Sequence, residues 1–163
     1  MTIQAIFFLQ FGASLLVFGL LAKWLLAPRL AQLSQQQVLF WLTLPHAFRY
    51  IGMVFLVPGV VDTLPDNFAL PAAYGDLLAA VLALLAMVAL RSGSKAAIGS
   101  VWVFNIIGTV DLLYALSHQG VVPQLGAAWF IPTMLVPVLL ITHFMIFANL
   151  FKPASVAKKS LAT

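Results

Sequence analysis

The residues that could do chemistry in this sequence interrupt long apolar runs. The stretch LPHAFRYIGMVF, from Leu44 to Phe55, places a histidine, an arginine and a tyrosine within five positions. Later runs hold isolated carboxyl, amide and imidazole groups. Ionisable groups in membrane-crossing runs are costly and usually face a bundle interior or a wet cavity, where they bind ligands or conduct ions and protons. The candidate binding or conduction cluster is therefore His46, Arg49, Tyr50, Asp76, Asn105, Asp111 and His143.

Arg49 is the member of this cluster that most needs a partner. An arginine near the centre of a bilayer costs about 2.5 to 3.5 kcal/mol on insertion scales, and a buried charge is better placed beside a counter-ion. Asp76 and Asp111 are the only acids within the apolar runs. We expect Asp111 to be the partner, assisted by Asn105, with Asp76 as the alternative. Alternatively, the same residues form an ion pair whose role is purely structural, in that it fixes how the helices pack.

His46 and His143 are candidates for a shared role because they lie at similar depths. Each is eight residues from one end of its apolar run, roughly 12 Å deep at about 1.5 Å per residue. Opposed imidazoles at one level can ligate haem, provided small residues admit the macrocycle. No glycine-rich slot adjoins either histidine, so the cofactor stays undetermined. A metal site is not expected, because the third histidine, His118, falls on the opposite side of the membrane from His46 and His143.

The elements that must position these groups are five apolar runs. Of the 163 residues, 63% are hydrophobic and 7% are charged, whereas soluble domains carry roughly a quarter charged residues. A membrane-spanning helix needs about 20 apolar residues. The sequence therefore predicts an all-α, polytopic membrane bundle, with a five-helix transmembrane domain over residues 1–151 and a short basic cytoplasmic tail over 152–163. The predicted spans are Ile3 to Leu26, Val38 to Val61, Leu70 to Leu90, Ala97 to His118 and Ala127 to Phe151.

The second run carries the densest set of polar groups. Residues that are three, four or seven positions apart share a face of an α-helix. His46, Arg49, Tyr50 and Met53 then form one stripe, which we expect to point into the bundle.

Charge predicts the orientation of the bundle, because basic residues in short loops stay cytoplasmic. Asp62 and Asp66 fall in a connection on the opposite side from most of the basic residues, so the amino terminus is predicted outside and the carboxy terminus in the cytoplasm. We expect an integral protein of a bacterial inner membrane whose partners are the lipid bilayer and further copies of itself. The net charge of +4 suits anionic headgroups and not nucleic acid. The basic residues predicted on the cytoplasmic side are Lys23, Arg29, Arg91, Lys95, Lys152, Lys158 and Lys159.

Two functions remain open on this evidence. In the first, the cluster is a binding site or path in a protein that conducts or transports protons, ions or small solutes. In the second, the same residues bind a cofactor or a lipid substrate, as in a bis-histidine haem protein or a membrane enzyme. Catalytic residues are not identified, because no H-E-x-x-H or nucleophile-elbow motif is present.

Overall fold

The computed structural model describes residues 1–152 and is helical throughout its regular segments. Five helices are long and apolar enough to cross a membrane, in agreement with the five apolar helices predicted from the sequence. Lys158, Lys159 and most of the predicted basic tail lie outside the described residues. These five helices are Ile3–Leu30, Gln35–Leu56, Asp66–Arg91, Ala97–Ser117 and Gly126–Leu150.

Three of the five spans change helix type along their length. The first consists of α1 (Ile3–Leu21), the π-helical turn η1 (Ala22–Leu26) and α2 (Ala27–Leu30). The second consists of α3 (Gln35–Thr43) and the 3₁₀-helix η2 (Leu44–Leu56). The third and fourth are the single helices α4 (Asp66–Arg91) and α5 (Ala97–Ser117). The short 3₁₀ segments η3 (Gln119–Gln124) and η4 (Gly126–Trp129), the π-helical turn η5 (Ile131–Leu135) and α6 (Val136–Leu150) complete the chain.

Local sequence signals set where these helices begin and end. The Ser34 side chain accepts a hydrogen bond from the backbone N–H of Gln37, whose side chain bonds back to the Ser34 N–H. This capping box satisfies free donors at the start of α3. Gly93 has φ of +66° in the turn after α4, a conformation that glycine adopts without steric cost.

The 3₁₀ geometry of η2 corrects the predicted face of the second span. A 3₁₀-helix has about three residues per turn, so positions i, i+3 and i+6 eclipse one another. The buried residues of η2 follow that period: His46, Arg49, Gly52 and Phe55. Tyr50 is turned outward and is 52% exposed. Its predicted place on the inner stripe was wrong because the α-helical period does not apply here.

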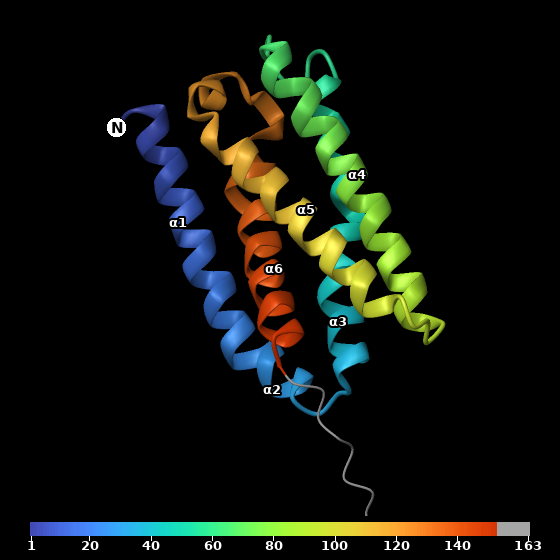
Figure 1. Ribbon diagram of the computed structural model, residues 1–163. Coiled ribbons are helices and arrows are strands. Elements are labelled where there is room, and N and C mark those ends of the chain that lie inside the picture. Colours follow the sequence, from blue (N-terminus) through green and yellow to red (C-terminus); the bar gives the residue numbers. More distant parts are fainter. Residues whose placement is uncertain (153–163) are drawn as a thin grey trace, which may run out of the picture.

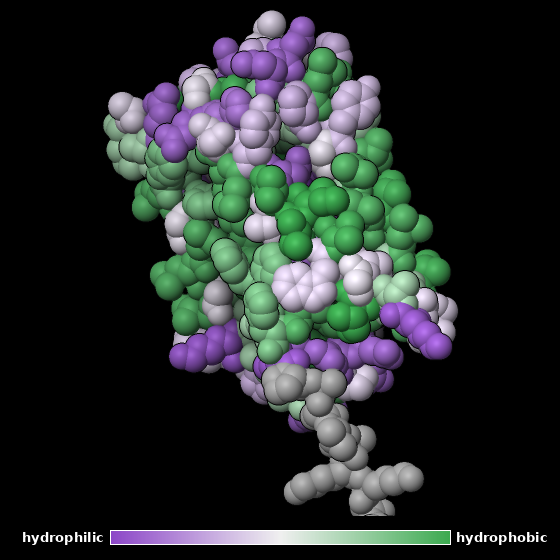
Figure 2. Space-filling view, viewed as in Figure 1, coloured by the Kyte–Doolittle hydropathy of each residue, from purple (hydrophilic) through white to green (hydrophobic). Residues whose placement is uncertain are grey.

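The bundle has an apolar middle and polar ends. In Figure 1, α1 lies at one edge beside α6, and α4 lies along η2 and α5. Figure 2 shows hydrophobic side chains over the middle of the molecule and hydrophilic ones gathered at both ends. α2, the α4–α5 turn and the end of α6 share one end, and η3 and η4 lie at the other (Figure 1).

Three apolar core clusters fill the interior, and two of them occupy its two halves. One, near η3, includes Phe55, Phe68 and Leu125. The other, near the basic end, includes Leu39, Phe104 and Ile146. Along η2 and α4 the buried polar residues fall between these two clusters. Along α5 and α6 they fall between the second cluster and the third, which includes Leu112 and Leu139, so they lie in the middle of the bundle.

Candidate functional site

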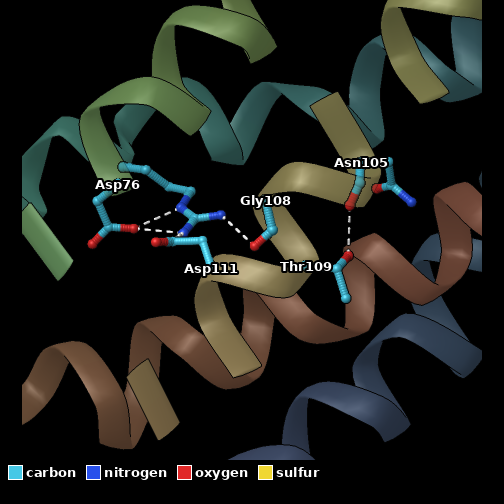
Figure 3. Close-up of polar contacts among 6 residues, drawn as sticks. Asp76, Asn105, Gly108, Thr109 and Asp111 are labelled. Atoms are coloured by element: carbon cyan, nitrogen blue, oxygen red, sulfur yellow. Dashed lines mark hydrogen bonds and ion pairs between the residues drawn. The ribbon is translucent and has the colours of Figure 1, made fainter. Parts of the chain in front are cut away.

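The site is centred on Arg49, which is 1% exposed. Its Nε donates to Asp76 Oδ1 at 2.7 Å, and its Nη2 lies 2.7 Å from the same oxygen. Nη2 also donates to Asp111 Oδ2, and Nη1 donates to the backbone oxygen of Gly108 at 2.9 Å. Figure 3 shows Asp76, Asp111 and Gly108 around these contacts. Every guanidinium nitrogen therefore has a partner, as a buried arginine requires.

The predicted pairing of Arg49 with Asp111 is confirmed, and the alternative partner Asp76 pairs with it as well. Both carboxylates contact the same Nη2 and therefore lie side by side. With all three groups ionised, one guanidinium (+1) against two carboxylates (−2) leaves a net charge of −1. One carboxylate is thus left without a full counter-charge.

Asn105 does not assist Arg49, contrary to expectation. Its Oδ1 lies 2.6 Å from His143 Nδ1, and its Nδ2 donates to the His143 backbone oxygen at 3.3 Å. The backbone oxygen can only accept, so it fixes the amide with Nδ2 toward it and leaves Oδ1 to accept from Nδ1–H. In a neutral His143 ring, the lone pair is then on Nε2.

His46 and His143 meet in the middle of the bundle. Their ring centroids are 4.0 Å apart with an interplanar angle of 50°, so the rings are in direct contact. His46 Nε2 lies 2.9 Å from Thr142 Oγ1, and that hydroxyl is 3.0 Å from the backbone oxygens of Val138 and Leu139. The hydroxyl proton goes to a backbone oxygen, so His46 Nε2 is the donor to Thr142.

This arrangement leaves two ring nitrogens without partners. Among the described residues, His46 Nδ1 and His143 Nε2 are buried and make no hydrogen bond. Because the two imidazoles touch, a haem macrocycle does not fit between them, and the bis-histidine ligation that the sequence left open as an alternative is not compatible with this packing.

Three glycines, one on each of three elements, make room for the polar groups. A Cβ built on Gly52 would collide with Asp76 Oδ2, and one on Gly75 with Asp111 Oδ1. A Cβ on Gly108 would lie 2.8 Å from His143 Cε1 and 3.0 Å from Arg49 Nη1. These glycines were missed in the sequence, although Gly52 follows Arg49 by three positions and Gly108 precedes Asp111 by three.

A cavity of about 50 Å³ lies against the two carboxylates on the side of η3. The Asp76 and Asp111 side chains are 12% and 14% exposed, whereas that of Arg49 is 0% exposed. The carboxylates are therefore accessible and the guanidinium is sealed. The lining includes Gln119, which is exposed, so the cavity reaches the molecular surface. Its other walls are mostly apolar and include Phe7, Phe55, Phe68, Leu112 and Ala115.

The structure thus brings six of the seven predicted site residues into one buried region and places Tyr50 outside it. Gly108 connects the two halves of this region, since a Cβ there would meet both His143 and Arg49. His118 lines the cavity near its mouth, far from the other histidines, as expected. Sequence reasoning missed Thr142, which carried no signal beyond being one position before His143.

Comparison with known proteins places the chain in a family. No curated protein matches the sequence, and no solved structure matches it. A family model matches residues 6–151, a stretch that includes every residue of the site. The chain belongs to the family described as the domain of unknown function DUF8737.

Proposed function

We propose that this protein is a small integral membrane transport protein that exchanges a proton at the Asp76–Asp111 pair. The observation that carries the proposal is the shared guanidinium: two carboxylates on one arginine, at the floor of a cavity that reaches one end of the bundle. A proton on either carboxyl group removes the unbalanced charge. Deprotonation restores it, so uptake and release have a defined electrostatic effect within the bundle.

The surroundings of the pair favour access from one end only. The cavity joins the carboxylates to the η3 end. Toward the basic end the contacting rings of His46 and His143 are followed by Phe104, whose ring centroid lies 5.0 Å from that of His46. Phe104 belongs to the apolar cluster of that half. This asymmetry suits a transporter in one of two alternating states better than an open channel.

The direction of access follows from the charge at the two ends. Basic residues lie toward the end away from η3 (Figure 1), at the ends of helices or in the turn between them: Lys23 in η1, Arg29 in α2, Arg91 at the end of α4 and Lys95 in the α4–α5 turn. Short basic connections stay in the cytoplasm. We place the amino terminus and the cavity mouth outside and the carboxy terminus in the cytoplasm, in a membrane such as the bacterial inner membrane.

A cofactor- or lipid-binding protein is the less favoured function. Ligand sites for drug-sized molecules and cofactors have volumes of about 300 to 1,000 Å³, and the cavity measures about 50 Å³. The volume suits water, a proton and small solutes.

Proton flux into vesicles tests the proposal. The purified protein is reconstituted into liposomes that contain a pH-sensitive dye, and an inward proton gradient is applied. We expect flux from the unmodified protein and its loss in Asp111→Asn, because an amide cannot carry the proton. This variant keeps the balanced Arg49–Asp76 pair and should fold.

The matched control is Asp62→Asn, which removes an exposed aspartate outside the cavity and should leave the flux unchanged. Unmodified protein in tight vesicles that carries no protons, or Asp111→Asn that carries as many as the control, would refute the proposal.

A further inference from the structure

We infer that the cavity above Asp76 and Asp111 binds a small organic ammonium ion, which competes with the proton for this carboxylate pair. The inference deepens the proposed function, on which it rests, because it uses the same two carboxylates. It follows from the charge at the floor of the cavity, the chemistry of its walls and its size.

The two carboxylates that line the cavity carry an unbalanced charge, and within the described chain each has one oxygen without a hydrogen bond. Asp76 bonds Arg49 through Oδ1 only, and Asp111 through Oδ2 only. Among residues 1–152, the second oxygen of each carboxylate makes no hydrogen bond. Asp76 is also 9% exposed and thus largely withdrawn from water. A ligand that brings one positive charge and several N–H donors satisfies both deficits.

The walls select against a bare metal ion. Calcium takes about six to eight oxygen ligands and magnesium about six. Besides the two aspartates, Gln119 is the one lining residue with a side-chain oxygen in the described part of the chain. An alkylammonium ion needs fewer oxygens, because its carbon atoms can rest against Phe7, Phe55 and Phe68. Aromatic rings also attract ammonium groups that approach their faces within about 6 Å.

The volume limits the size of the ion. One water-sized sphere needs about 10 to 15 Å³, so a cavity of about 50 Å³ holds a few such spheres. A ligand of roughly three to five non-hydrogen atoms fits. Propylammonium has this size, whereas tetrabutylammonium is far too large.

Exchange then follows from charge balance. One ammonium ion and one proton each neutralise the single unbalanced carboxylate, so the two compete for the same place. Binding of the ammonium ion releases the proton, and its departure allows the proton to return. The net charge of the occupied cluster is zero in both states.

Thermal unfolding of the purified, detergent-solubilised protein tests the inference, with propylammonium chloride as the probe. A ligand that binds only the folded protein raises the unfolding temperature in a saturable way. We expect this saturable rise with propylammonium and its absence with 1-propanol, sodium chloride and tetrabutylammonium chloride. The three control compounds separate the effects on the unfolding temperature: 1-propanol tests charge, sodium chloride tests ionic strength and tetrabutylammonium chloride tests size.

Two variants locate the site. Asp111→Asn should raise the half-saturating concentration roughly ten- to hundredfold, the range for one lost hydrogen bond to a charged group, and Asp62→Asn should not. Ala115→Leu fills the cavity from its wall and should remove the shift. Ala148→Leu, on the exposed face of α6, makes the same change outside the cavity and should keep it.

An equal shift with 1-propanol, or a propylammonium shift unaffected by Asp111→Asn and Ala115→Leu, would overturn the inference. If no propylammonium shift occurs while the unmodified protein still carries protons in vesicles, this inference fails and the proposed function stands. If the shift depends on Asp111 but no proton flux occurs, proton exchange fails and the ammonium site remains supported.

Discussion

Arg49 uses the full geometry of its guanidinium. Nε and Nη2 reach Asp76 Oδ1, Nη2 also reaches Asp111, and Nη1 reaches the Gly108 backbone oxygen. These acceptors come from two helices and lie at different angles around one planar group. A lysine ammonium is a point charge without such a fork. The residue therefore joins η2, α4 and α5 and also holds both carboxylates at the cavity.

Removal of Arg49 should expose the cost of two buried carboxylates without a counter-ion. We expect Arg49→Leu to lower the free energy of unfolding by about 3 to 5 kcal/mol, the range for breaking a buried ion pair. Adding Asp111→Asn should recover only part of the loss, because Asp76 remains unpaired. The triple variant with Asp76→Asn should recover more. Denaturant unfolding in detergent measures the series, and a double variant as stable as the triple would show that Asp76 contributes no uncompensated charge.

At the scale of the element, helix type decides which side chains meet. The five apolar spans could be predicted, because length and hydropathy are local properties of the sequence. The Arg49–aspartate contacts could also be predicted, since the spans hold no other acids. The face of η2 could not, because the sequence pattern does not distinguish a long 3₁₀-helix from an α-helix. Tyr50 was misplaced for that reason.

Other features of the site depend on contacts between distant elements. Asn105 binds His143, which is 38 positions away, and His46 binds Thr142, which is 96 positions away. No spacing within one helix indicates such partners. The glycines opposite Asp76, Asp111 and His143 likewise acquire their role only when the helices pack.

Close helix packing at Gly108 gives a prediction for α5. Gly108→Ala would place a Cβ 2.8 Å from His143 Cε1 and 3.0 Å from Arg49 Nη1. We expect a loss of about 1 to 3 kcal/mol in the free energy of unfolding, as for other overpacked interiors. Gly99→Ala on the same helix meets nothing within 4 Å and should be neutral or stabilising by up to about 1 kcal/mol. Equal stability of the two variants would contradict the close approach at Gly108.

At the scale of the whole molecule, charged residues lie toward both ends (Figure 2), and a buried polar cluster lies between them in the interior of the bundle. Basic residues lie toward one end, Asp62 and Asp66 lie at the other, and the ionisable groups between them are held within apolar layers. The cavity opens toward the acidic end. Because the two ends differ in charge, the side from which the cavity is accessible is set by the orientation of the chain in the membrane.

Topology reporters test that orientation. A reporter that is active only in the cytoplasm should be active when fused after Lys152 and inactive when fused after Thr63, because basic connections stay inside. A reporter active only outside the cytoplasm should give the reverse pattern in the same two fusions. The opposite results would place the cavity mouth on the cytoplasmic side.

The central claim is that the Asp76–Asp111 pair binds and releases a proton while held by Arg49. Infrared spectroscopy of the purified protein measures this directly through the carbonyl stretch of a protonated carboxyl group. We predict a band that disappears as the pH is raised, is absent in the Asp76→Asn, Asp111→Asn double variant and is retained in Asp62→Asn. Unmodified protein without a band dependent on Asp76 and Asp111, at any pH at which it stays folded, would contradict the account.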